Sequence, residues 1–126
     1  GNLSLTNGID VSKLSHDPAV QQAYRSDPWV HSKVTPRFFV QLEETMARAR
    51  SAHHTSYPLL LVVAGNDEVV STPAAKQWFS ALNSPLKDFF EVVGGRHENL
   101  NEGGPSAPPG VDKGVVACRV LEFVSK

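Results

Sequence analysis

The sequence has 126 residues, of which 40% are hydrophobic and 20% charged, an ordinary balance for one small globular domain. Its 12 basic and 13 acidic residues are mixed along the chain, so it lacks the basic stripe that a nucleic acid requires. The longest apolar run, Leu59 to Ala64, is far shorter than the ~20 residues of a membrane-spanning helix, and the N-terminus shows no signal-peptide pattern. We therefore expect a soluble protein, cytoplasmic or peripherally bound to a membrane, without a nucleic-acid partner.

Cysteine and histidine usage gives no indication of a metal centre. Cys118 is the one cysteine, so the chain cannot form an internal disulfide, and no Cys/His cluster has the spacing of zinc ligands. His53 and His54 follow a predicted helix, where histidines interact favourably with the negative end of the helix dipole. His16 and His31 have no partner that the sequence identifies. We expect neither a metal ion nor a cofactor.

The first half of the chain predicts two helices after a loop. Residues 1–14 are polar with scattered apolar positions and predict a loop. Asp17-Pro18 is a helix start signal, and the helix is expected to end before Asp27-Pro28. Thr35-Pro36 repeats this signal, and apolar residues recur at helical spacing over residues 38–49. The second helix is the clearest amphipathic helix of the sequence.

The second half predicts two parallel strands joined by a helix. Residues 59–64 suit a strand buried on both faces, and Thr72-Pro73 is expected to cap a helix. Trp78 and Phe79 would cover the sheet from that helix, and residues 89–93 would form the second strand. Such a unit places both strand ends at the same edge of the sheet. Two parallel strands are a poor sheet by themselves, so part of the sheet is expected to lie elsewhere.

A surface loop and a last helix complete the predicted elements. Residues 103–110 contain three prolines and three glycines, which is typical of a surface loop. Asp112 can cap the final helix, whose inward-facing residues would be Val116, Val120, Phe123 and Val124.

Polar residues follow each predicted strand, and functional groups of open α/β sheets gather at these carboxyl ends. The sequence GNDE, residues 65–68, follows the first strand, and GGRHE, residues 94–98, follows the second. If the strands are neighbours, Asp67 and His97 lie close enough for the carboxylate to hold one imidazole nitrogen. This pair is the acid and base half of a catalytic triad. The simpler alternatives are that Asp67 is a turn former and that His97 is an ordinary loop histidine.

Three stretches resemble a known family. GNDEVVSTPAAKQWF is similar to the turn that carries the triad acid in α/β hydrolases, and FFEVVGGRHENLNE is similar to their strand and triad histidine. LSHDPAVQQAYRSDPWVHSKVTPRFFVQL resembles the cap of the monoacylglycerol lipase and lysophospholipase-like branch. The resemblance implies that Asp67 is the triad acid, that His97 is the triad base, and that Val69 and Val70 border the acyl pocket.

The resemblance also implies a fold class and a domain organisation. The chain would be the C-terminal portion of an α/β-hydrolase fold: cap helices, the last two parallel strands, the crossover helix and the terminal helix. Residues 1–56 would belong to the cap, in which Phe38 and Phe39 fit the core better than a substrate contact, and residues 57–126 to the hydrolase core. Glu98 and Glu102 could orient the histidine loop, although exposed acids are the ordinary case.

No nucleophile is recognised in the sequence. The family places its serine in a Gly-x-Ser-x-Gly elbow ahead of the cap. Ser106 comes nearest, with Gly104 two residues before it but Pro108 two residues after it, and it follows the histidine. The expected partner is therefore an N-terminal part of the same hydrolase that carries the serine, and the chain alone should not turn over a substrate.

Two functions from different classes remain open. The leading hypothesis is part of a serine esterase or lipase that acts on a small acyl ester, a monoacylglycerol or lysophospholipid-like substrate, with any membrane contact made through the cap. The alternative is a non-catalytic, hydrolase-derived interaction module that completes a partner's sheet. A nucleotide-binding module is weaker, because the sequence has no Gly-x-Gly-x-x-Gly or phosphate loop.

Overall fold

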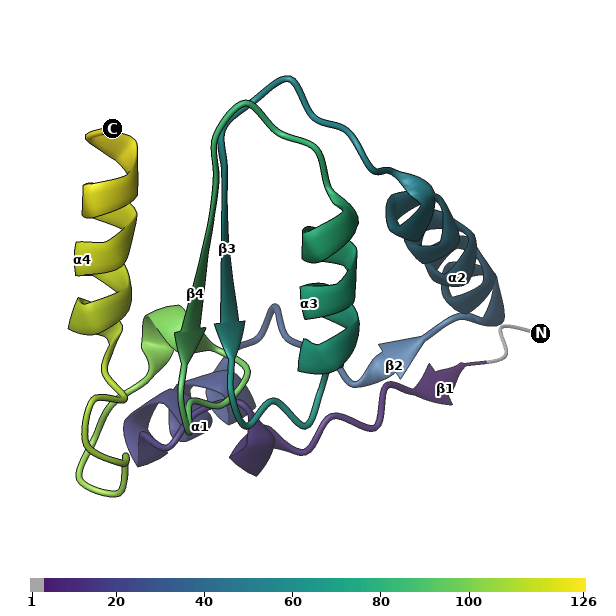
Figure 1. Ribbon diagram of the computed structural model, residues 1–126. Helices are drawn as coiled ribbons and strands as arrows, with labels where there is room; N and C mark the ends of the chain where they lie inside the picture. Colours follow the sequence, from purple (N-terminus) through teal and green to yellow (C-terminus); the bar gives the residue numbers. More distant parts are fainter. Residues whose placement is uncertain (1–3) are drawn as a thin grey trace.

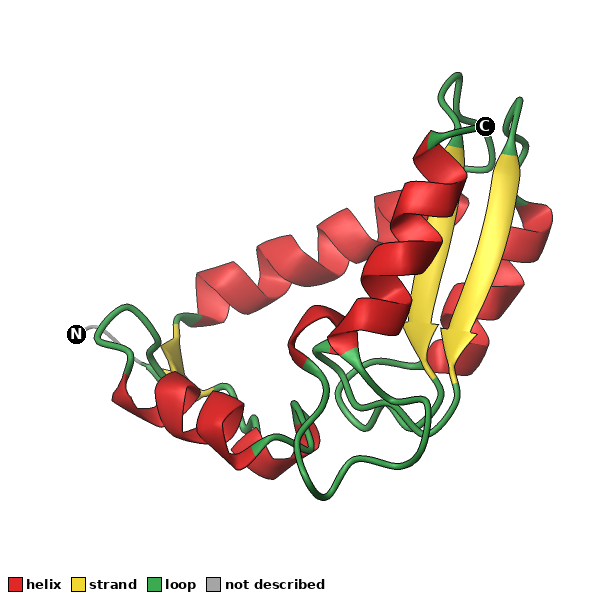
Figure 2. Cartoon of the chain, turned by 90° about the vertical axis from the view of Figure 1, so that its left-hand side faces the viewer, coloured by secondary structure: helices red, strands yellow, loops and turns green. Residues whose placement is uncertain are grey.

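The computed structural model describes residues 4–126 and is built around two parallel strands (Figure 1). Strand β3 (Leu59–Ala64) pairs in parallel with β4 (Lys87–Val92), and helix α3 (Thr72–Ala81) connects them. Helix α3 covers one face of the pair, and helix α4 (Lys113–Val124) covers the other (Figures 1 and 2). The predicted unit of strand, helix and strand is confirmed. The second strand, predicted over residues 89–93, spans Lys87–Val92 instead.

The two faces of β4 bury different aromatic rings because successive side chains of a strand point to opposite faces. Phe89 packs against Phe79 of α3, with ring centroids 5.7 Å apart. Phe90 packs on the opposite side against the buried core cluster under α4. That cluster consists of Val92, Val111 and Val116, and its partly buried neighbours are Val62, Phe90 and Ala107.

Strand β3 is less buried than its apolar sequence predicts. Only Val63 and Ala64 are buried, and the four residues before them are half-buried. Within residues 4–126, β3 pairs with β4 alone, so its other edge has no strand beside it. The prediction of a strand buried on both faces is therefore correct only for its carboxyl end.

The helix starts follow the local sequence signals. Asp17 caps α1 (Pro18–Ser26), Thr35 caps α2 (Pro36–Ser51) and Asp112 caps α4, each by accepting a backbone N–H in the first turn. For α3 the predicted cap was wrong by one residue, because Ser71 accepts the N–H of Ala74. The Thr72 hydroxyl is occupied elsewhere: it donates to the carbonyl of Ala64, at 2.6 Å, and ties the helix to the strand end.

The N-terminal region contains short elements that the predicted loop did not include. Strand β1 (Leu5–Thr6) pairs antiparallel with β2 (Lys33–Val34), and the 3₁₀ helix η1 (Val11–Lys13) follows. Residues 1–3 of the predicted loop lie outside the described part of the chain. Two-residue strands carry no periodicity, so local sequence patterns could not reveal them.

Helix α2 lies apart from the sheet (Figure 1). The side chains of its apolar stripe are exposed. Phe38 and Phe39 are each 53% exposed, so the prediction that they form a cap core is wrong for the described chain. The end of α2 is fixed by Trp78 of α3, whose indole N–H contacts the carbonyl oxygens of Ala49 and Ala52 at 3.1 and 3.0 Å. Trp78 was predicted to cover the sheet, and its contact with the end of α2 is an additional one.

Helix α4 and the loop before it agree with prediction in part. Val116 is buried and Phe123 half-buried, but Val120 and Val124 are exposed, so the expected inward face was too wide. The loop over residues 103–110 lies mainly at the surface, although Gly103 is buried. None of the helices in residues 4–126 is long and apolar enough to cross a membrane.

Candidate active site

Two loops meet at the carboxyl ends of β3 and β4. We call residues 65–70 the acid loop and residues 94–102, which include the 3₁₀ helix η2 (Asn99–Asn101), the histidine loop. The Asn66 N–H donates to the Gly95 carbonyl at 2.9 Å, and the Gly65 N–H donates to the Val92 carbonyl at 2.9 Å. A Cβ atom at Gly65 would lie 3.1 Å from the Val92 carbonyl oxygen, so this close approach of the two backbones favours glycine.

The acid loop and the histidine loop bring Asp67 and His97 together. His97 Nδ1 lies 3.0 Å from Asp67 Oδ2. The Asp67 side chain is 5% exposed and the His97 side chain 33% exposed. The other carboxylate oxygen, Oδ1, accepts the N–H groups of Val69 at 2.8 Å and Val70 at 2.9 Å. Both carboxylate oxygens are thus held, which fixes the orientation of the group that faces the histidine.

This arrangement determines which imidazole nitrogen is available. A carboxylate only accepts hydrogen bonds, so the Nδ1–H of His97 donates to Asp67 and Nε2 of the neutral ring carries the lone pair. Among residues 4–126, no side chain or backbone group forms a hydrogen bond with Nε2 of His97. The site presents a proton acceptor that is oriented by a buried carboxylate, the chemistry of a general base.

Opposing effects act on the pKa of Asp67. Burial raises this pKa, but the N–H of Val70, the imidazole of His97 and the N–H of Val69 favour the ionised form. The net result is a pKa below the ordinary value for aspartate. Asp67 therefore stays ionised at neutral pH, as a group that stabilises an imidazolium must.

A second carboxylate lies behind the histidine loop. Glu102 is buried, with 1% of its surface exposed, so the expectation that it is an exposed acid is wrong. It accepts the backbone N–H of His16 at 2.9 Å, the Ser15 hydroxyl at 3.2 Å and the N–H of Arg96. His16 Nδ1 lies 3.0 Å from Glu102 Oε1. These contacts could not be predicted from local sequence patterns, because 86 residues separate His16 from Glu102.

The pKa of Glu102 shows the same balance. Burial raises this pKa, while the backbone N–H groups of His16 and Arg96 and the His16 side chain lower it, for a net decrease. The folded-state pKa of both Glu102 and Asp67 thus lies below the ordinary values of 4.5 and 3.8. Each ionised carboxylate stabilises the folded chain above its ordinary pKa, and this stabilisation is lost as the pH falls through the folded-state pKa.

We expect the free energy of unfolding of the full-length protein to fall steeply below about pH 4. Urea unfolding over a pH series measures this, and the double variant Asp67→Asn, Glu102→Gln should show a shallower decrease. The matched control is Glu122→Gln, because the Glu122 side chain is 64% exposed. An acid dependence that is unchanged in the double variant would contradict the role of these two carboxylates.

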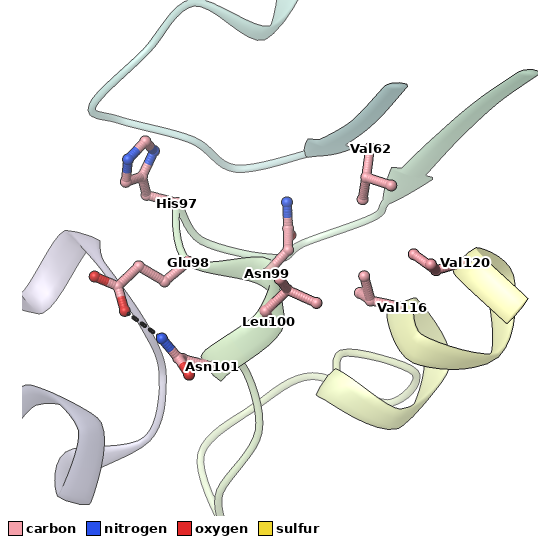
Figure 3. Close-up of a pocket in the computed structure, with 8 residues that line it drawn as sticks. All are labelled: Val62, His97, Glu98, Asn99, Leu100, Asn101, Val116 and Val120. Atoms are coloured by element: carbon pink, nitrogen blue, oxygen red, sulfur yellow. Dashed lines mark hydrogen bonds between the residues drawn. The ribbon is translucent and has the colours of Figure 1, made fainter. Parts of the chain in front are cut away.

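A cleft of about 400 Å³ opens beside His97 (Figure 3). Its lining includes Val62 of β3, Val116 of α4, Leu100 and Asn99. The side-chain oxygen of Asn99 is buried and has no hydrogen-bond partner within residues 4–126. Most of the lining is apolar, so the cleft can hold an apolar group next to the histidine.

The other candidate site residues have the following positions and contacts. Val69 and Val70 hold Asp67 through their backbone N–H groups, a role that the sequence did not reveal. Their side chains are 36% and 54% exposed, and Val70 borders a separate groove of about 440 Å³ between α2 and α3. Ser106 donates to the His16 carbonyl and Cys118 is exposed, and neither forms a hydrogen bond with His97.

The fold is that of an α/β hydrolase. Residues 1–104 match the hydrolase family model described as "Serine aminopeptidase, S33", and the chain belongs to this family. The predicted resemblance to the branch of monoacylglycerol lipases and lysophospholipases is confirmed.

Relatives and solved structures agree with this membership. The monoacylglycerol lipase of Paleococcus ferrophilus superposes with a TM-score of 0.81 at 27% identity, over 98% of this chain and 46% of that chain. A soluble variant of monoglyceride lipase from Saccharomyces cerevisiae shares the fold, with a TM-score of 0.74 at 16% identity, over 98% of this chain and 43% of that chain. Phospholipase YtpA of Bacillus subtilis is 27% identical over 103 residues, which are 80% of this chain and 40% of YtpA. The chain spans less than half the length of these relatives.

Proposed function

We propose that the chain provides the acid and the base of a serine hydrolase that cleaves small acyl esters of the monoacylglycerol or lysophospholipid type. The observation that carries the proposal is the 3.0 Å contact between Asp67 and His97 at the shared carboxyl edge of β3 and β4. A buried carboxylate on Nδ1 and an unoccupied Nε2 are what a general base for a serine requires. The names of the lipase and phospholipase relatives support the ester class.

In the proposed reaction, His97 moves protons while a serine carries the acyl group. Nε2 of His97 takes the proton of the serine hydroxyl as its oxygen attacks the ester carbonyl carbon. The bond to the alcohol then breaks, and the alcohol leaves with the proton from His97. A water molecule repeats the sequence on the acyl-enzyme and releases the fatty acid. Asp67 remains ionised and stabilises the imidazolium in both halves.

The serine is proposed to come from a segment upstream of residue 1. No Gly-x-Ser-x-Gly is present in the sequence, and the chain corresponds to 46% of the Paleococcus lipase. The unpaired edge of β3 and the cleft beside His97 are where such a segment would add strands and bring its serine to Nε2. The alternative function, a module that completes a partner's sheet, would use the same edge of β3.

We further propose that the cap contacts lipid through α2. This helix exposes apolar side chains on one face that suit a lipid surface: Phe38, Phe39 and Leu42. Such a contact would bring the site to substrates that reside in membranes.

The test is a substrate panel with the full-length protein that contains this sequence. Its members are a monoacylglycerol, a lysophosphatidylcholine, a short-chain p-nitrophenyl ester and an amino-acid p-nitroanilide. We expect turnover of the esters and none of the anilide above the rate of a His97→Ala blank. Anilide turnover that exceeds ester turnover would indicate an aminopeptidase instead. Absence of all turnover in a folded protein would favour the non-catalytic module.

A further inference from the structure

Residues 13–16, which connect η1 to α1, contact both site loops. The His97 N–H donates to the Lys13 carbonyl at 3.4 Å, and the Glu98 N–H donates to the Leu14 carbonyl at 2.8 Å. On the other side, the Lys13 ammonium lies 2.6 Å from the carboxylate of Glu68, the residue after Asp67. This short segment therefore bridges the acid loop and the histidine loop.

Glu102 anchors that segment to the histidine loop from inside the protein. One oxygen, Oε2, accepts the Ser15 hydroxyl and the His16 backbone N–H. The other, Oε1, accepts the Arg96 N–H and faces His16 Nδ1. The Glu102 side chain is 0% exposed, so these groups replace water completely. The Arg96 side chain adds a bond from Nη1 to the Ser15 carbonyl at 3.0 Å.

The backbone on either side of His97 is consequently held by one network. The Arg96 N–H is fixed by Glu102, and the Glu98 N–H is fixed by the carbonyl of Leu14, which precedes Ser15. A rotation of the loop that turned His97 away from Asp67 would have to break bonds in the buried interior. Breaking them without replacement would leave buried polar groups without partners, which is unfavourable.

We propose that Glu102 is a positioning residue for the general base: through Arg96 and residues 13–16 it holds the backbone that aims His97 at Asp67 and at the serine. This proposal rests on the proposed function for its effect on catalysis. It assigns a role to the contact between His16 and Glu102, which lies outside the Asp67–His97 pair.

A carboxylate is required at this position because every neighbour is a donor. The Arg96 and His16 N–H groups donate to Glu102, and the Ser15 hydroxyl is shared between Glu102 and the Asn101 carbonyl. A glutamine has the same shape, but its NH₂ group would face these donors and leave at least one of them without an acceptor. Glu102→Gln therefore removes the positioning network with little change in volume.

The experiment compares the full-length wild type with Glu102→Gln, the milder Ser15→Ala and the control Glu122→Gln. Steady-state kinetics on a short-chain p-nitrophenyl ester give kcat and KM, corrected for the folded fraction by circular dichroism. The downfield proton resonance of the His97 Nδ1–H, assigned by its loss in His97→Ala, reports the bond to Asp67.

We expect Glu102→Gln to lower kcat about 10- to 100-fold with KM within about twofold, because the base is misplaced in the transition state. The His97 Nδ1–H resonance should broaden or disappear in Glu102→Gln, whereas Glu122→Gln should match the wild type. If Glu102→Gln does not fold, Ser15→Ala provides the test of the positioning role. For Ser15→Ala we expect a smaller decrease in kcat and a broadened His97 Nδ1–H resonance.

A wild-type kcat and an intact His97 resonance in the folded variant would overturn the proposal, because a merely structural role would change the stability alone. A wild type that cleaves no ester would count against the proposed function. In that case the resonance still tests the positioning role, which survives if the signal is lost in Glu102→Gln and fails if it is kept.

Discussion

Replacing Asp67 with asparagine in the full-length protein is expected to lower kcat for ester hydrolysis about 10⁴-fold. The reason is the hydrogen-bond geometry of the acid loop. The N–H groups of Val69 and Val70 require an acceptor, so the asparagine oxygen must take the position of Oδ1. Its NH₂ group then faces His97, and Nδ1 has to become the acceptor. The proton moves to Nε2, and the histidine can no longer take a proton from a serine.

The control for this variant is Asp88→Asn. Asp88 lies near the start of β4, away from the site, and pairs with Arg119 at 2.7 Å. Its replacement should leave kcat unchanged. Ester kinetics with a p-nitrophenyl substrate measure both variants, and KM should stay within about twofold because Asp67 acts in the transition state. An Asp67→Asn protein with wild-type kcat would show that the acid is only a turn former.

Replacing His97 with alanine is expected to have the largest effect, a decrease in kcat of about 10⁵- to 10⁶-fold. The substitution removes the imidazole that contacts Asp67 at the shared edge of β3 and β4. Without it the serine hydroxyl has no base to take its proton, and the leaving alcohol has no acid to supply one. The same loss should slow the reaction of the serine with a fluorophosphonate.

His31→Ala is the matched control for this histidine. His31 is exposed and contacts the carbonyl of Lys33 in the predicted cap region. We expect its removal to leave ester turnover at the wild-type level. Residual turnover above about 1% in His97→Ala would require another base and would contradict the assignment, because general bases contribute about 10²- to 10⁴-fold.

Local sequence signals predicted much of the fold. Asp17, Thr35 and Asp112 were recognised as caps because capping depends on residues within one helical turn. The shift from Thr72 to Ser71 at α3 was not predictable from such rules. It arises because the Thr72 hydroxyl bonds to Ala64, which is eight residues away in the sequence and belongs to another element.

The candidate pair of the site was also accessible from sequence. Asp67 and His97 each follow a predicted strand, and the strand-end rule places such residues at one edge of a parallel sheet. The structure adds the contact between them, and their catalytic roles remain a proposal. The boundary between cap and core at residue 56 remains a prediction as well.

The buried network around Glu102 could not be predicted, for a physical reason. A glutamate is ordinarily exposed, and its burial here depends on donors from Ser15 and His16 that are far away in the chain. For Phe38 and Phe39 the error was the reverse, because they were predicted to lie in a core and are exposed. An apolar stripe indicates which face of α2 is suited to burial, but it does not indicate what covers that face within this chain.

We propose that His97, oriented by Asp67, activates a serine of the same hydrolase. Fluorophosphonate labelling of the full-length protein, followed by mass spectrometry of the labelled peptide, tests it most directly. We expect one label on the serine of a Gly-x-Ser-x-Gly sequence upstream of residue 1, and labelling slower by about 10³-fold in His97→Ala. A folded wild type that takes no label, or equal labelling rates in the two proteins, would contradict the claim.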